Sequence, residues 1–186
     1  SMAAAPASAL RQRTFVSGSG SDSNPCTLSS PCRQFSSALA NTLPGGELLV
    51  LDSAGYGPLT ITKAVTIVVP SGVYAGVSVF SGVGISVNAG AGNKVTLRGL
   101  TVTGLGGTIG ISFASGDALY LDNVTVSGFG GGPAIDASVG SAASALFIRD
   151  SAIRDNAIGL HTATTSGSLT LKVERSVFER NGTGAS

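Results

Sequence analysis

The sequence contains no tryptophan, one histidine and two cysteines, and charged residues make up only 11% of the chain. The 11 Lys and Arg residues nearly balance the 10 Asp and Glu residues, which gives a formal net charge of +1 and no basic stripe. This balance argues against nucleic acid and anionic membrane surfaces as partners. No uninterrupted apolar run reaches the roughly 18 residues of a transmembrane helix, so we expect no membrane insertion.

The two cysteines, Cys26 and Cys32, lie close together in the sequence. With a single histidine elsewhere they do not supply the four ligands of a structural zinc site, and we expect neither a metal nor a cofactor. Such a pair either closes a small loop as a disulfide or remains as two free thiols. We favour the disulfide, which predicts an exported protein that is secreted, periplasmic or held at the cell surface.

Small and apolar residues make up much of the sequence. Of its 186 residues 27 are glycine and 42% are hydrophobic, with a mean hydropathy of +0.37. Residues 1–13 are unpatterned and are interpreted as a disordered tail or a remnant of tag cleavage. Residues 14–186 then form one domain, with a first strand, the cysteine loop and a cap helix in 14–46 and repeated coils in 47–186.

One helix is expected, directly after the cysteine loop. Pro31 suits a helix start, and Phe35, Ala38 and Leu39 recur at the spacing of one helical face before the break at 43–46. This spacing predicts about three turns of amphipathic helix. From residue 47 onward the apolar period changes to two, which is typical of β-strands.

A pattern of short strands repeats along the second half of the chain. Related segments begin at Val95, Leu119, Leu146 and Leu171, which lie 24, 27 and 25 residues apart. A second motif recurs at Ile111, Ile135 and Leu160, with spacings of 24 and 25 residues. One unit has too few apolar residues to bury itself, whereas stacked units form a continuous core. The repeat therefore predicts an all-β solenoid with two recurring strand motifs in each period of about 25 residues.

Alignment of the repeats assigns a role to each column of residues. Inward-facing residues are Val95, Leu119, Leu146 and Leu171, followed around a corner by Val102, Val126, Ile153 and Phe178. The corner positions are Gly99, Asn123, Asp150 and Arg175, of which the first three tolerate a left-handed backbone. Asn156 and Asn181 lie 25 residues apart and are expected to bond through their amides along the solenoid axis.

These features, from the polar opening and cap helix to segments such as SAIRDNAIGL and SVFERNGTG, resemble the right-handed parallel β-helix proteins of the pectate-lyase-like superfamily. The resemblance covers residues 14–186 and implies a right-handed parallel β-helix, of a kind common in bacteria. It does not select an activity, because the superfamily includes lyases, hydrolases, esterases, epimerases and adhesive or structural proteins.

A column of charged residues is the candidate site. It consists of Arg98, Asp122, Arg149 and Glu174, one from each repeat. These residues are either cross-strand ion pairs that keep register and solubility, or contacts for an acidic or neutral polysaccharide. As an enzyme, the chain would be a polysaccharide lyase or glycoside hydrolase with Asp122 as acid or base and Arg149 and Arg154 as anion contacts.

We favour a non-catalytic scaffold or carbohydrate-contacting module over an enzyme. The sequence has no Asp-Asp pair, and its only histidine, His161, fits a surface position on a strand. Asp22, in a glycine-rich loop, makes a weak cation site alone. Each carboxylate in the charged column has a cationic neighbour, which keeps it ionised. The last repeat stops one strand into a further coil, so we also expect truncation or self-association through an uncapped C-terminal end.

Overall fold

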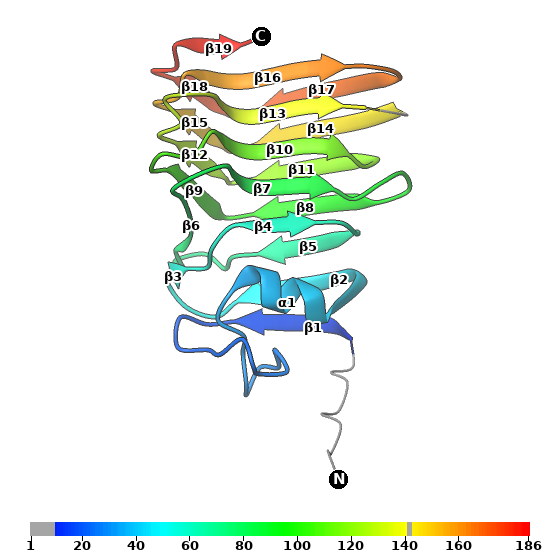
Figure 1. Ribbon diagram of the computed structural model, residues 1–186, viewed down its shortest axis with the longest axis vertical. Helices are drawn as coiled ribbons and strands as arrows, with labels where there is room; N and C mark the ends of the chain where they lie inside the picture. Colours follow the sequence, from blue (N-terminus) through cyan, green and yellow to red (C-terminus); the bar gives the residue numbers. More distant parts are fainter. Residues whose placement is uncertain (1–9, 141–142) are drawn as a thin grey trace.

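Three parallel β-sheets wind around one apolar core and define a parallel β-solenoid (Figure 1). The structure is a computed structural model and describes residues 10–140 and 143–186. Sheet A contains β1 (Arg11–Val16), β2 (Thr42–Val50), β5 (Val65–Val68), β8 (Lys94–Arg98), β11 (Ala118–Asp122), β14 (Ala143–Arg149) and β17 (Ser168–Glu174). Sheet B contains β3 (Ala54–Gly55), β6 (Ala75–Val79), β9 (Leu100–Gly104), β12 (Thr125–Ser127), β15 (Ala152–Arg154) and β18 (Val177–Glu179). Sheet C contains β4 (Leu59–Ile61), β7 (Val83–Asn88), β10 (Ile109–Ser115), β13 (Pro133–Val139), β16 (Ile158–Thr164) and β19 (Thr183–Ala185).

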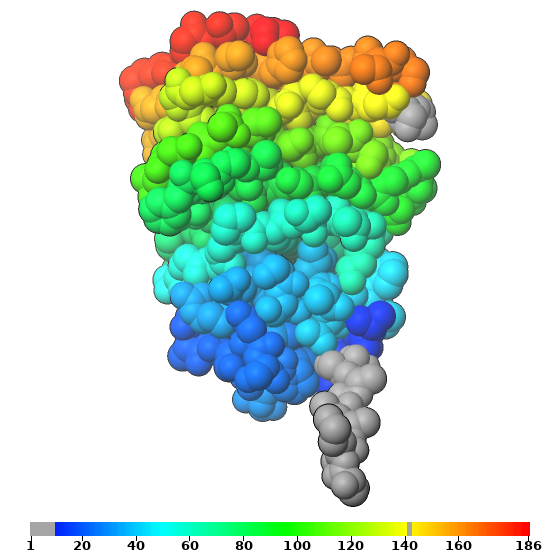
Figure 2. All heavy atoms as spheres, viewed as in Figure 1, coloured from blue at the N-terminus to red at the C-terminus, as the bar shows by residue number. Residues whose placement is uncertain are grey.

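From β2 onward, each turn of the solenoid contributes one strand to each sheet, and the turns stack in sequence order along the long axis (Figure 2). Leu119 is in register with Val95 on one side and Leu146 on the other, and Leu146 is in register with Leu171. The second motif aligns in the same way at Ile111, Ile135 and Leu160. Both predicted columns are therefore confirmed, and so is the solenoid.

The corner between sheets A and B divides each copy of the first motif into two strands, which the sequence pattern had counted as one. The first motif folds as two strands, because its middle residue has a left-handed backbone that turns the chain. The φ values there are +79° at Gly99, +52° at Asn123, +51° at Asp150 and +46° at Arg175. Each turn thus has three strands rather than two. The corner column includes an arginine, a residue type that sequence reasoning did not expect to tolerate this conformation.

Stacked aliphatic side chains fill the interior. Leu97, Leu119, Val126 and Ile135 are among the residues with no exposed surface. Within the described residues, every buried side-chain nitrogen or oxygen has a hydrogen-bond partner. Asn156 is an example, because its Nδ2 donates to Asn181 Oδ1 across 3.0 Å, which confirms the predicted bond along the axis. The apolar core and the satisfied corners together hold the turns in register.

The N-terminal end is closed by the cysteine loop and by α1 (Phe35–Asn41), which contacts β1, β2 and β4. Cys26 and Cys32 form a disulfide, as predicted. The helix is shorter than expected and begins after Pro31, because Cys32 pairs with β1. The Cys32 N–H donates to Phe15 O at 3.0 Å, and the Cys32 carbonyl accepts from Ser17 N at 2.9 Å.

The first strand begins at Arg11, so residues 11–13 belong to β1 and not to the tail predicted for residues 1–13. Of the rest of that predicted tail, Leu10 is exposed ahead of the strand, and residues 1–9 lie outside the described residues. Arg13 and Gln12 are exposed, and the Arg13 guanidinium pairs with Glu47 of β2 at 2.8 Å. Among the helices of the described residues, none has the length and apolarity needed to cross a membrane.

Candidate functional site

The charged column runs along the last outward position of sheet A. Register pairing places Arg98, Asp122, Arg149 and Glu174 on four successive strands. Asp122 lies between two guanidinium groups. Arg149 donates to its carboxylate through Nε at 2.9 Å and Nη2 at 3.1 Å, and Arg98 donates through Nη2 at 3.2 Å. The Asp122 side chain is only 13% exposed, whereas those of Arg98 and Arg149 are 53% and 46% exposed.

This arrangement keeps Asp122 ionised. The hydrogen bonds from Arg149 lower the pKa of the Asp122 carboxyl below its ordinary value, and burial opposes them with a smaller effect. The bonds to Asp122 in turn raise the pKa of Arg149. A general acid or base works best with a pKa near the working pH, and here the carboxylate is held away from it. Asp122 is thus suited to accept hydrogen bonds and unsuited to transfer protons.

Glu174 does not extend the hydrogen-bonded ladder. Its carboxylate pairs with Lys172 on the same strand at 2.7 Å, and Lys172 is the main reason why the pKa of Glu174 is lowered. Residues two apart on a strand face the same side, so this partner competes directly with Arg149 of the neighbouring strand. The hydrogen-bonded part of the column therefore joins three turns, those of Arg98, Asp122 and Arg149.

Arg154 lies apart from this cluster. It is an exposed residue of β15 in sheet B, in register with Ser127 and Glu179. Of the three residues in the catalytic alternative, the structure brings together Asp122 and Arg149 through hydrogen bonds and leaves Arg154 around the corner. A reaction that needs all three at one substrate bond does not fit this geometry.

A groove with a volume of about 590 Å³ follows the corner between sheets A and B. One wall is the turn at 70–73, and the other contains Arg98, Asp122, Arg149 and Arg175 with the corner residues Asn123 and Asp150. Arg175 donates to Asp150 through Nε at 2.7 Å and Nη2 at 2.8 Å. Three guanidinium groups and two carboxylates line the groove, which leaves one positive charge in excess.

Two aromatic side chains beside the groove were missed by sequence reasoning. Tyr120 of β11 and Phe147 of β14 are in register on the outer face of sheet A. Their ring centroids are 4.7 Å apart, and their planes differ by 5°. A cavity of about 250 Å³ adjoins them and is bordered by Arg149, Lys172 and Glu174. The repeat alignment contained the signal, because both residues precede an inward-facing residue, Leu121 or Ile148, in adjacent units.

Arg149 connects these features, since it lines both the corner groove and the aromatic cavity. We call the two together the sheet A trough, defined by Arg98, Tyr120, Asp122, Phe147 and Arg149. The trough offers ring surface, guanidinium donors and an ionised acceptor within two adjacent hollows. Such a mixture of apolar surface and a few polar groups is typical of ligand sites.

The remaining titratable groups have structural partners or lie elsewhere on the surface. Asp52 accepts hydrogen bonds from Ser17 Oγ and Gly18 N at 2.6 Å and from the Tyr56 hydroxyl, and these bonds lower its pKa. Asp22 accepts from two backbone N–H groups ahead of α1, so its role is to order that loop. Within the described residues, no group of three or more His, Cys, Asp and Glu side chains is arranged to hold a metal ion.

The fold and the trough define a parallel β-solenoid with one polar and aromatic outer face. Comparisons with protein-family models, with curated proteins and with solved structures give no match for this chain. The chemistry of the trough is therefore the basis for assigning a function.

Proposed function

We propose that the protein is a non-catalytic carbohydrate-contacting module in which the solenoid presents the sheet A trough to a polysaccharide. The observation that supports this most strongly is the shared position of Arg149, between the Tyr120–Phe147 ring stack and the ionised Asp122. An extended ligand that lies across the trough would contact both hollows at once.

The chemistry of the trough matches that of a sugar chain. Sugars combine apolar C–H faces with many hydroxyl groups, and aromatic side chains provide rigid apolar surface at small entropic cost. Guanidinium groups donate to hydroxyl or carboxylate oxygens, and the Asp122 carboxylate accepts from hydroxyl groups. The excess positive charge among Arg98, Arg149 and Arg175 favours an acidic over a neutral sugar chain.

Lyase or hydrolase activity on an acidic polysaccharide is the alternative, and two features weigh against it. Asp122 and Asp150 each accept paired hydrogen bonds from an arginine, and their pKa values are lowered. A glycoside hydrolase instead needs one carboxyl group whose pKa is raised so that it can protonate the leaving oxygen. Arg154, the third residue of the catalytic hypothesis, lies on another sheet.

We infer two further properties in line with this role. The solenoid and its cap helix support membership of the pectate-lyase-like superfamily, whose members include polysaccharide-acting proteins. The Cys26–Cys32 disulfide supports export to an oxidising compartment, a setting in which polysaccharides occur.

The test is a polysaccharide array that includes a polyuronate and a neutral glucan, with calcium, read for binding and for product formation in the same wells. We expect binding to the polyuronate without turnover. Phe147→Ala and Arg149→Ala should weaken that binding, whereas Phe80→Ala and Arg13→Ala should not, because these exposed control residues lie outside the trough. Turnover abolished by Asp122→Asn would establish the enzyme alternative, and absence of any binding would refute the proposal.

We also propose that the C-terminal end of the solenoid associates with a second copy. β17 and β18 are the last strands of sheets A and B, and Leu171, Val173 and Val177 there are 42%, 42% and 52% exposed. Strand edges with exposed apolar side chains favour association. Sedimentation should show a concentration-dependent dimer that Val173→Glu abolishes and Leu28→Glu preserves, since Leu28 is 64% exposed in the N-terminal loop. A monomer at all concentrations would refute this.

A further inference from the structure

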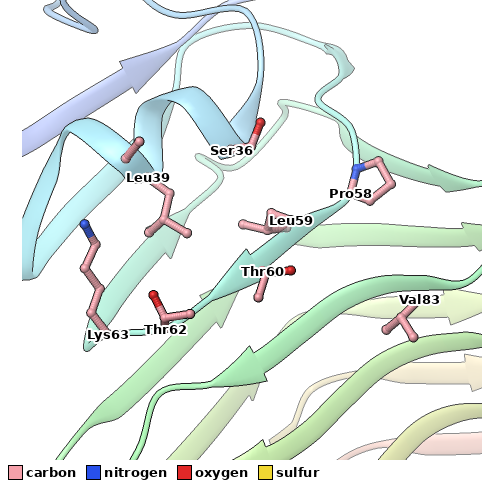
Figure 3. Close-up of a pocket in the computed structure, with 9 residues that line it drawn as sticks. Ser36, Leu39, Pro58, Leu59, Thr60, Thr62, Lys63 and Val83 are labelled. Carbon is pink, nitrogen blue, oxygen red and sulfur yellow. The ribbon is translucent and has the colours of Figure 1, made fainter.

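A third hollow, separate from the two of the sheet A trough, lies between α1 and β4, toward the opposite end of the molecule from the exposed C-terminal turn (Figure 3). Its volume is about 500 Å³, which lies within the range of small-molecule sites. Apolar lining comes from Leu39, Pro58, Leu59 and Val83, and polar lining comes from the hydroxyl groups of Ser36, Thr60 and Thr62 and from Lys63. The cavity shares no lining residue with the sheet A trough, so the following inference is independent of the proposed function.

The cavity exists because a helix occupies the place of a strand. Sheet C begins at β4, and α1 packs next to that strand at the N-terminal end of the sheet (Figure 1). A helix has a rounder surface than a strand and does not follow the pleat of the sheet. Its inner side buries Leu39 against the core, while the hollow along β4 remains open to solvent.

Among the described residues, Lys63 is the only charged one that lines this cavity. It lies two residues beyond Ile61, the last residue of β4, and its half-buried side chain extends toward α1 (Figure 3). The Nζ atom donates a hydrogen bond to the carbonyl of Thr42, which follows the last residue of the helix. An ammonium group has three N–H donors, so this carbonyl satisfies only one of them.

Lys63 has no anionic partner among the described residues. No ion pair of the described chain includes it, although Arg13, Lys172, Arg175 and Arg180 each pair with a carboxylate. Burial without a counterion disfavours the charged form and lowers the pKa of Lys63. The protein thus holds a partly desolvated cation at a cavity and leaves its charge uncompensated, which an anion from solution would relieve.

We propose that this cavity binds a small organic carboxylate, whose carboxylate group pairs with Lys63 while its carbon skeleton lies against Leu59 and Val83. Two features select this class of ligand. One ammonium matches one carboxylate charge, whereas a phosphate dianion would leave a charge unpaired. The hydroxyl groups of Thr60 and Thr62 can donate to the second carboxylate oxygen or to a bridging water.

The shape of the cavity fits the same ligand. Figure 3 shows Lys63 and Val83 at opposite ends of the labelled residues, with Leu59 and Thr60 between them. The polar end at Lys63 and the apolar end at Val83 suit an unbranched acid of a few carbon atoms. Leu39 and Leu59 are each only 5% exposed, so they provide a firm apolar floor.

Hexanoate is the probe, with hexanol as its uncharged counterpart. Titration of uniformly ¹³C,¹⁵N-labelled protein with hexanoate should shift the Lys63 side-chain signals and the amides of β4, with saturation, while hexanol should cause much smaller shifts. Lys63→Gln keeps a donor for the Thr42 carbonyl but removes the charge, and it should weaken hexanoate binding about tenfold or more. Lys94→Gln, at an exposed lysine of β8, is the matched control and should leave binding unchanged.

Val83→Phe provides a test that does not depend on the structural role of Lys63. The larger ring fills the apolar end of the cavity and should abolish binding while the Lys63–Thr42 hydrogen bond remains. The proposal is overturned if hexanoate causes no saturable shift at Lys63, if hexanol binds as tightly, or if either Lys63→Gln or Val83→Phe binds hexanoate like the wild type. Should Lys63→Gln fail to fold, the Val83→Phe result decides.

Discussion

A pair of leucines in one column offers a quantitative test of the solenoid. Leu119 in β11 has no exposed surface and is in register with Val95 and Leu146, so apolar side chains flank it on both sides along the axis. Leu119→Ala removes its side chain from a site with little freedom to collapse. We expect the free energy of unfolding to fall by about 2–5 kcal/mol, from lost burial and the cavity left behind.

Leu171 is the matched control, because it occupies the same column two turns later. It has a neighbour on one side only, Leu146, and its side chain is 42% exposed. Leu171→Ala leaves no closed cavity, since solvent already reaches the site. We expect a loss of about 1 kcal/mol, or less than half of the loss at the buried position.

Urea unfolding followed by far-UV circular dichroism measures both losses. The comparison requires equal m-values, because a changed slope would indicate that the amount of surface exposed on unfolding had changed. Equal losses for Leu119→Ala and Leu171→Ala, or a larger loss at Leu171, would refute the assigned stacking. Either result would mean that the two leucines do not occupy an interior and a terminal position of one column.

Three further outcomes are expected. The pKa values of Asp52 and Asp122 are lowered in the folded state, so their contributions to stability are present above the unfolded pKa of about 4 and are lost as the pH falls through the lower folded values. Thermal midpoints measured against pH should therefore fall in acid. Asp122→Asn should make this fall smaller. Cys32→Ser opens a loop with a sequence separation of 6, which should cost about 2 kcal/mol in urea unfolding, and an unchanged midpoint would contradict this. A Cβ at Gly110 would lie 2.4 Å from the Ala134 carbonyl oxygen, whereas one at Gly130 meets nothing within 4 Å, so Gly110→Ala should lower the melting temperature and Gly130→Ala should not.

The repeat made most of the fold predictable. Equivalent strands of a parallel solenoid pair in register, so a spacing of about 25 residues with an apolar period of two is enough to identify the neighbours of Leu119 and Ile135. The first strand was predicted, but its first residues, 11–13, were wrongly assigned to the tail because they lie outside the repeat. All three residues are polar, Gln12 and Arg13 are exposed, and Arg11 and Arg13 are in register with residues of β2.

The helix start was mispredicted because the signal at Pro31 was local and the competing contact was not. The pairing of Cys32 with β1 joins residues that only the folded cap brings together. Local propensity is overridden where such tertiary contacts satisfy the backbone.

The candidate site was only partly predictable. Register alone placed Arg98, Asp122 and Arg149 in one column, and the structure adds the hydrogen bonds between them. The choice of Lys172 over Arg149 as the partner of Glu174 was not predictable, since both cations face the same side and exposed ion pairs differ by little in energy. The Lys63 cavity depends on where α1 packs, which no repeat encodes.

The central claim is that the sheet A trough contacts a sugar chain through Phe147 and Arg149 together. The most direct test is the dissociation constant of a polyuronate for the wild type, for the double variant Phe147→Ala/Arg149→Ala, and for the control double variant Phe80→Ala/Arg13→Ala, each checked for folding by circular dichroism. We predict binding that the trough double variant weakens by about tenfold or more and that the control variant leaves unchanged. Equal binding by all three proteins, or no binding by the wild type, would contradict the account.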